Sequence, residues 1–186
     1  MKRYIFVFIF AFFCTYFADT QSCGPPNRSV KWNAIHLYLN RLSLGYEWAF
    51  RDHTSILTWL DYGRRSVLEQ RFWHNEMGIN LELRYYFLGR YIEGLYVTPY
   101  AVMRYKHNVG DLYDGRPTPY APLAIQVQGN HWDYSGGMQV GYQYIIDNQF
   151  VMDMFVGTGY YHWGDPGAKD AANVLLRLGF CLGYAY

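Results

Sequence analysis

The chain has few cysteines, few charges and no long apolar segment after its first residues. Its 186 residues include only 3 cysteines, too few for a disulfide-stabilised scaffold. Charged residues make up 17% of the sequence, and the formal net charge of +1 provides no basic surface for nucleic acid. After Phe17 no segment approaches the roughly 18 consecutive apolar residues that a membrane-spanning helix requires. These features argue against a disulfide-rich, a nucleic-acid-binding and a helical membrane protein.

Aromatic residues and glycine are abundant instead. Phe, Trp and Tyr account for 20% of the chain, and there are 18 glycines. Aromatic side chains are enriched in strands, and glycine within strands is typical of crowded or bent positions in a sheet. The composition therefore favours many strands over long helices.

The N-terminus has the layout of a secretory signal peptide. Two basic residues precede an apolar segment at residues 4–17, and small and polar residues follow it. We predict a signal peptide at residues 1–20 and a periplasmic N-terminal segment at residues 21–29. Export would leave Cys23 and Cys181 in an oxidising compartment, where Cys23 is a candidate for lipidation or for a disulfide with Cys181.

Strict alternation of apolar with small or polar residues recurs along the rest of the chain. The clearest examples are "LSLGYEWAF", "GINLELRYYF", "YSGGMQVGYQYII", "FVMDMFVGTGY" and the C-terminal "VLLRLGFCLGYAY". Weaker alternation covers residues 30–39, 55–62 and 95–106. Together these segments predict about eight strands, which we assign to one domain at residues 30–186.

The links between the predicted strands are of two kinds. Short links lie at residues 51–54, 88–94 and 147–149, and long links lie at residues 63–74, 107–131 and 164–173. One link, in the first hairpin near Asn40 and Arg41, is short where a long one is expected. Short turns at one end and long loops at the other are typical of an up-and-down barrel.

The alternation defines two faces of the sheet without saying which face is buried. A secreted soluble ligand-binding barrel would bury the apolar face, whereas a transmembrane barrel would turn that face to lipid. Glycines crowd the face that carries the small and polar residues, which we call the minority face. Aromatic residues lie near strand ends, and the last residue is aromatic. These features favour an all-β, eight-stranded antiparallel up-and-down transmembrane β-barrel in the outer membrane, with both termini in the periplasm.

The two faces supply the candidate site residues. The charged residues of the minority face form a predicted polar network of the lumen, composed of Glu47, Glu82, Arg84, Arg104, Lys106, Asp153 and Arg177. The aromatic residues predicted at the membrane interfaces are Trp48, Phe50, Phe87, Trp132, Tyr160, Trp163, Tyr184 and Tyr186. A proton or ion path through the lumen is the alternative interpretation of the network.

Several of these segments resemble known proteins. The C-terminal "VLLRLGFCLGYAY" resembles the assembly signal of Gram-negative outer-membrane barrels, with Cys181 where a glycine is often found. The segments "KWNAIHLYLNRLSLGYEWAF", "INLELRYYF", "GLYVTPYAVMRY" and "GMQVGYQYIIDNQFVMDMFVGTGYY" resemble an uncharacterised family of small eight-stranded outer-membrane proteins, a domain of unknown function. The resemblance implies the fold, outer-membrane lipid as surroundings and the barrel-insertion machinery as an assembly partner. It implies no activity.

Histidines and the tripeptide "HTS" are the candidates for chemistry. The histidines at positions 74, 107, 131 and 162 lie in or beside long links without metal-ligand spacing, so we predict no metal and no other cofactor. His53 and Ser55 have the spacing of lipid A deacylases, yet they fall in a predicted periplasmic turn, away from lipid A. We therefore predict a structural or accessory role without catalysis, with a lipid-modifying enzyme as the alternative. The link at residues 107–131 is the predicted surface for a protein partner.

Overall fold

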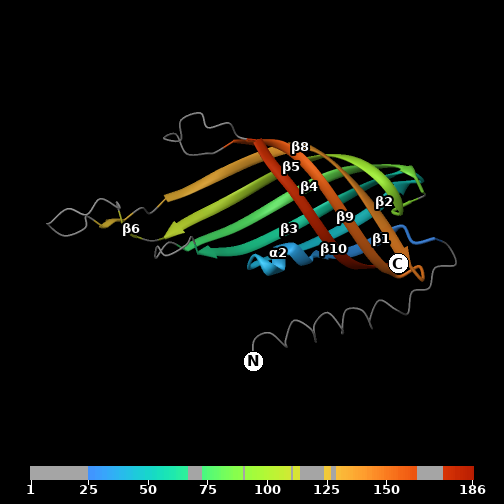
Figure 1. The fold of residues 1–186 in the computed structure, drawn as a ribbon, viewed down its shortest axis with the longest axis horizontal. Helices are drawn as coiled ribbons and strands as arrows, with labels where there is room; N and C mark the ends of the chain where they lie inside the picture. Colours follow the sequence, from blue (N-terminus) through green and yellow to red (C-terminus); the bar gives the residue numbers. More distant parts are fainter. Residues whose placement is uncertain are drawn as a thin grey trace, which may run out of the picture.

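Eight antiparallel strands close into a barrel in the computed structural model, which describes residues 25–66, 73–89, 91–109, 111–113, 124–126, 129–162 and 174–186. Their order round the wall is β1-β10-β9-β8-β5-β4-β3-β2, so each strand pairs with its neighbours along the barrel meander. The barrel strands are β1 (Arg28–Asn33), β2 (Arg41–Arg51), β3 (Thr54–Ser66), β4 (Trp73–Leu88), β5 (Gly94–Val109), β8 (Gly129–Ile146), β9 (Phe150–His162) and β10 (Val174–Ala185). The predicted eight-stranded antiparallel barrel is confirmed (Figure 1).

The short turns and the C-terminus lie at one end of the barrel, which we call the periplasmic end (Figure 1). Ala185 donates its backbone N–H to Gln149 in the β8–β9 turn at 2.6 Å, and Ala49 donates to Asn27 at 2.8 Å. The N–H of Tyr91 in the β4–β5 turn is bonded to the carbonyl of Asp52 in the β2–β3 turn. These bonds stabilise the periplasmic end as one connected rim.

The first strand is shorter than the sequence predicted. A strand was expected over residues 30–39, but β1 ends at Asn33 and the helix α2 (Ala34–Tyr38) follows. Asn33 caps this helix, since its Oδ1 accepts hydrogen bonds from the N–H groups of Ile35 at 3.0 Å and His36 at 3.2 Å. Asn40, with φ of 58°, then turns the chain into β2. No helix among the described residues is long and apolar enough to cross a bilayer.

Two predicted long links are shorter than expected because strands extend into them. The link at residues 63–74 loses its ends to β3 and β4, which reach Ser66 and begin at Trp73. The link at residues 107–131 likewise contains the ends of β5 and β8, together with a two-stranded sheet of β6 (Asp111–Tyr113) and β7 (Ala124–Gln126). The side chains of this small sheet lie outside the described part of the chain.

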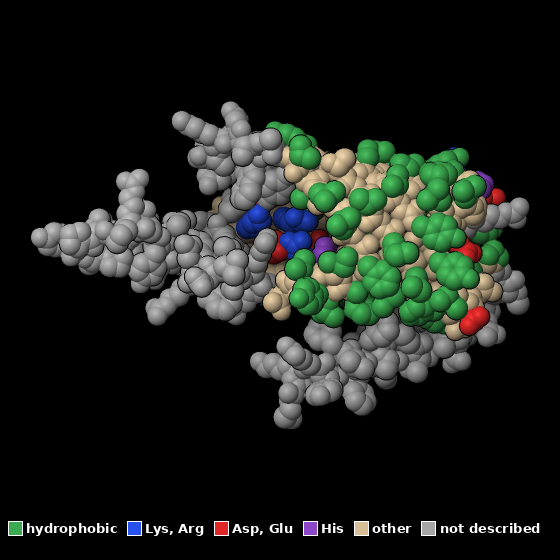
Figure 2. Space-filling model, viewed as in Figure 1, with side chains coloured by type: hydrophobic (Ala, Val, Ile, Leu, Met, Phe, Trp, Pro, Cys, Tyr) green, Lys and Arg blue, Asp and Glu red, His purple; other side chains and the backbone are tan. Residues whose placement is uncertain are grey.

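The outside of the barrel is apolar and the inside is charged. On β4, Leu81, Leu83 and Tyr85 keep 52%, 48% and 53% of their surface exposed. The alternating Glu82, Arg84 and Tyr86 keep 1%, 0% and 0%. Figure 2 shows the same arrangement over the face in view, where hydrophobic side chains cover the wall. This distribution is the reverse of a soluble barrel, so the soluble alternative is wrong.

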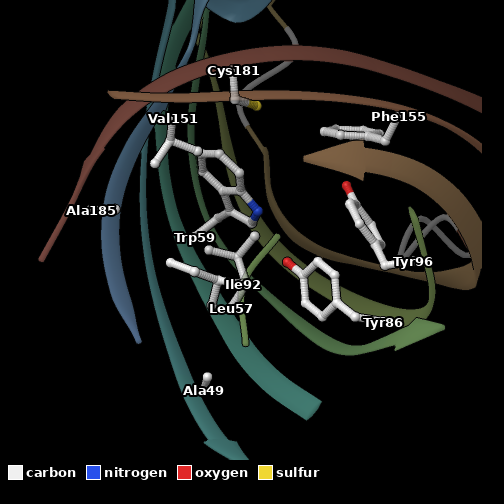
Figure 3. Close-up of a cluster of buried hydrophobic side chains, with 10 residues drawn as sticks. All are labelled: Ala49, Leu57, Trp59, Tyr86, Ile92, Tyr96, Val151, Phe155, Cys181 and Ala185. Carbon is white, nitrogen blue, oxygen red and sulfur yellow. The ribbon is translucent and has the colours of Figure 1, made fainter. Parts of the chain in front are cut away.

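A cluster of apolar side chains fills the interior toward the periplasmic end. It combines Ala49, Leu57, Val151 and Ala185 from the strands with Ile92 from the β4–β5 turn. The Trp59 ring lies among them (Figure 3), and Tyr86 and Tyr96 continue the buried set on the side of β4 and β5. These apolar side chains therefore pack the interior beside the buried charged groups, since Leu57 pairs with Glu47 on one side and with Glu82 on the other.

Candidate functional site

The middle of the barrel holds five charged side chains that we call the inner network: Lys31, Glu47, Glu82, Arg84 and Asp153. They come from β1, β2, β4 and β9, and each is at most 1% exposed. Burying an ionised group is costly unless it is paired and hydrogen-bonded, so the contacts of each member decide what the network does.

Two basic groups connect the three carboxylates. Lys31 Nζ lies 2.5 Å from Glu47 Oε2 and 3.1 Å from Asp153 Oδ2. Arg84 donates from Nη1 to Asp153 at 2.7 Å and from Nη2 to Glu82 at 2.9 Å. The guanidinium carbon of Arg84 also lies 4.2 Å from the centre of the Tyr96 ring. The network thus joins opposite parts of the wall from inside.

Neutral donors satisfy the remaining carboxylate oxygens. The hydroxyls of Tyr86 and Tyr96 donate to Glu47 and Asp153, each at 2.7 Å. Glu82 accepts from the indole N–H of Trp59 at 3.0 Å and from the side-chain amide of Gln139 at 2.9 Å. With these donors the buried carboxylates are solvated by the protein in place of water.

A second group of basic side chains lies nearer the outer end and is called here the outer cationic cluster: Arg41, Arg104, Lys106 and Arg177. Arg41 Nε donates to Glu76 at 2.8 Å, and Lys106 Nζ lies 2.5 Å from Asp133. Arg177 Nη2 donates to Glu82 at 2.8 Å, which connects this cluster to the inner network.

His36, Ser43 and Asp61 form a hydrogen-bonded group beside the outer cationic cluster. His36 Nδ1 lies 2.5 Å from Ser43 Oγ, and Ser43 donates to Asp61. In a catalytic triad the histidine lies between the other two, whereas here the serine does. The arrangement ties α2 to β2 and β3.

The predicted interface aromatics lie on the outside of the barrel. Trp48, Phe50, Phe87, Trp132 and Tyr160 are exposed, and Tyr184 and Tyr186 are partly exposed. Trp163 lies outside the described residues. Near the outer end the rings of Tyr105 and Trp132 pack with centroids 5.1 Å apart, as expected for side chains at a headgroup layer.

The structure places all seven predicted lumen residues inside the barrel, and it adds members that the sequence analysis missed. Lys31 lies in the part of the first alternating segment that does form a strand. The alternation there assigns Lys31 to the inward face, so the sequence contained the signal that would have identified it. Arg41 and Glu76, which form an ion pair, lie at the edges of predicted links. No alternating pattern covers these positions, so the sequence does not assign their side chains to the inside or the outside of the barrel. Asp61 and Asp133 required knowledge of the strand register.

His53 and Ser55 serve separate partners. His53 Nδ1 lies 3.0 Å from the carbonyl oxygen of Tyr86, and Ser55 donates to Glu47 at 2.5 Å. His107 contacts Asn130 at 2.5 Å, while the side chains of the other three histidines considered for metal binding lie outside the described part. Within the described residues no group of three or more His, Cys, Asp or Glu side chains could hold a metal ion. The predicted signal peptide and Cys23 also lie outside these residues, and Cys181 is buried.

A family model described as "Protein of unknown function (DUF3575)" matches residues 5–167 of the sequence. The chain belongs to this family. An antiparallel barrel with an apolar exterior and a charged interior is the form in which β-proteins cross the outer membrane, and this member of the family is an outer-membrane barrel. A comparison with curated proteins finds no match.

Solved structures similar to this member include small outer-membrane barrels. The N-terminal β-barrel domain of Pseudomonas aeruginosa OprF has 11% identity and a TM-score of 0.47, with 88% of this chain and 99% of that domain covered. A major outer membrane protein from Thermus thermophilus has 14% identity and a TM-score of 0.49, with 88% and 100% covered. The Yersinia pestis outer membrane protein Ail has 11% identity and a TM-score of 0.40, with 87% and 99% covered.

Proposed function

We propose that this barrel is a structural or accessory component of the outer membrane that neither conducts solutes nor catalyses a reaction. The observation that carries the proposal is the inner network, whose charged members span the interior without exposed surface. A water-filled path would leave at least part of these groups accessible.

The pairing of the inner network supports a static role. Lys31 contacts two carboxylates and Arg84 contacts three, and those carboxylates receive further hydrogen bonds from tyrosine, serine, tryptophan and glutamine side chains. Moving an ion past this group would require breaking several buried, charge-assisted bonds at once. The apolar cluster around Ile92 blocks the same route toward the periplasmic end.

The contacts of the candidate nucleophiles support the absence of catalysis. Ser55 is fully buried and donates to Glu47, and Ser43 is 2% exposed and donates to Asp61. Neither serine has the arrangement in which a histidine, itself held by a carboxylate, removes its proton.

The accessory part of the proposal concerns two partners. The β5–β8 connection, with the small sheet of β6 and β7, extends from the outer end and is the proposed contact for a protein partner. The C-terminal strand β10, which ends in alternating outward aromatics, is the proposed contact for the barrel-insertion machinery during assembly.

Osmotic swelling of vesicles tests the proposal. The full mature chain is refolded into phospholipid vesicles and placed in iso-osmotic arabinose, with a general porin in parallel vesicles as the positive control. We expect vesicles containing this barrel to swell no faster than protein-free vesicles. Swelling that rises with the amount of folded barrel would contradict a closed interior.

A further inference from the structure

The barrel wall is interrupted as a sheet near the outer end of β10. β1 pairs with β10 only at Cys181–Ala185, and its pairing with β2 begins at Leu44. Among the described residues, no strand pairs with Val174–Phe180 on this side, and α2 contacts β10 and β2 there instead (Figure 1). The interruption follows directly from the Asn33 cap that ends β1.

This interruption lies at membrane depth. Val174, Leu176 and Leu178 point outward from the unpaired stretch with 76%, 68% and 54% of their surface exposed. Backbone N–H and C=O groups that meet hydrocarbon without a partner are costly, which is why membrane barrels normally have no open edge. A partner with its own polar groups and an apolar chain would suit this edge.

The outer cationic cluster stands directly behind the interruption. Arg177 points inward from the stretch of β10 that lacks a partner on the β1 side, and His36 on α2 lies 3.9 Å from Asp61 of β3. Arg41 is next to Leu42, which pairs across the strands with Tyr62, and Lys106 is next to Tyr105, which pairs with Trp132. The outward aromatic side chains of these pairs mark the headgroup layer. Figure 2 shows basic side chains, with acidic ones and a histidine beside them, visible from the side of the barrel at this end.

The buried polar atoms without a hydrogen-bond partner among the described residues include two in this region that can donate to a ligand. One is Nη1 of Arg177, whose other terminal nitrogen donates to Glu82. The other is the hydroxyl of Tyr100, a residue only 4% exposed, whose ring lies 4.6 Å from the Arg177 guanidinium carbon. Buried donors without partners are uncommon in folded proteins and are often explained by a group that the polypeptide itself does not supply.

We propose that the interruption binds one anionic lipid of the outer leaflet, with its phosphate held by the outer cationic cluster and its acyl chains along the outward side chains of Val174, Leu176 and Leu178. Arginine suits this task because its planar fork of N–H groups matches phosphate oxygens. Four basic side chains lie here with four carboxylates (Asp61, Glu76, Glu82 and Asp133), so the headgroup would be held by hydrogen bonds from Nη1 of Arg177 and from the Tyr100 hydroxyl, and not by an excess of charge.

Native mass spectrometry of the mature chain in detergent micelles tests this site. The probe is dioleoyl phosphatidic acid, and dioleoyl phosphatidylcholine is the comparison because its chains are identical and its phosphate is masked by choline. We expect one phosphatidic acid to remain bound per barrel and phosphatidylcholine to bind at least about tenfold more weakly, the equivalent of one lost charged hydrogen bond.

Variants connect the binding to the cluster. Arg177→Gln should weaken phosphatidic acid binding by about tenfold or more. Arg41→Gln, at the rim of the barrel, should also weaken phosphatidic acid binding. It provides the test if Arg177→Gln does not fold. Arg51→Gln is the matched control, since Arg51 is exposed at the periplasmic end. A heat-modifiable gel band verifies that each variant is folded.

Four outcomes would overturn the proposal. The first is equal binding of the two lipids, and the second is full binding by both cluster variants. The third is displacement of the lipid by an equal concentration of inorganic phosphate, which would indicate a site for free anions. The fourth is a dimer that forms with loss of lipid binding, which would mean that a second copy covers this edge.

Discussion

Arg84 and Asp153 join β4 to β9 through the interior of the barrel, with Arg84 Nη1 2.7 Å from Asp153 Oδ2. Two strands, β5 and β8, separate β4 from β9 along the shorter path round the wall. The pair therefore ties together parts of the wall that have no direct backbone contact. Because neither side chain has exposed surface, the tie is protected from screening by salt.

Replacing Arg84 with methionine should destabilise the barrel by about 3–5 kcal/mol, because Asp153 and Glu82 would each lose a buried cationic partner. Unfolding of the chain in phospholipid vesicles by guanidinium chloride measures this change. Arg51→Met, at the exposed periplasmic end, is the control and should change the free energy of unfolding by less than about 0.5 kcal/mol. Equal stability of the two variants would show that Arg84 is dispensable.

Replacing Gly45 with alanine should destabilise the barrel by about 1–3 kcal/mol through overpacking. A Cβ atom at position 45 would lie 2.7 Å from Cε3 of the Trp59 ring, which is 2% exposed and held by its hydrogen bond to Glu82. At Gly63 the nearest atom is the carboxylate oxygen of Glu76, 3.2 Å away at the end of a flexible side chain. Gly63→Ala should therefore cost less than Gly45→Ala in the same unfolding assay, and the reverse order would refute the packing argument.

Replacing Tyr186 with alanine should slow assembly by the barrel-insertion machinery several-fold. Alanine would keep the backbone hydrogen bonds of 3.2 and 2.9 Å between Arg28 and Tyr186, so the variant removes only the partly exposed aromatic ring at the end of the seam between β1 and β10. The fraction of heat-modifiable barrel formed over time in proteoliposomes measures the effect. Tyr142→Ala, an outward aromatic on β8, is the control. Equal rates for the two variants would remove the special role of the C-terminal residue.

The sequence predicted the faces of the barrel better than its contacts. Alternation assigned Glu82 and Arg84 to the interior correctly because a strand has a period of two residues, whatever its neighbours. It could not predict that Arg84 contacts Asp153, since that contact depends on the stagger of strands far apart in sequence. It also extended the first strand to residue 39, because the apolar alternation of "NAIHLYL" hides a helix whose cap is a single asparagine side chain.

The gel mobility of the membrane fraction, boiled against unboiled in SDS after washing with urea or carbonate, tests the central claim most directly. The claim is that the apolar face meets lipid and the charged face lies inside. We expect the protein to stay with the membranes and to give a compact band that shifts on boiling. Release into the wash, or a single mobility under both conditions, would contradict a closed barrel embedded in the outer membrane.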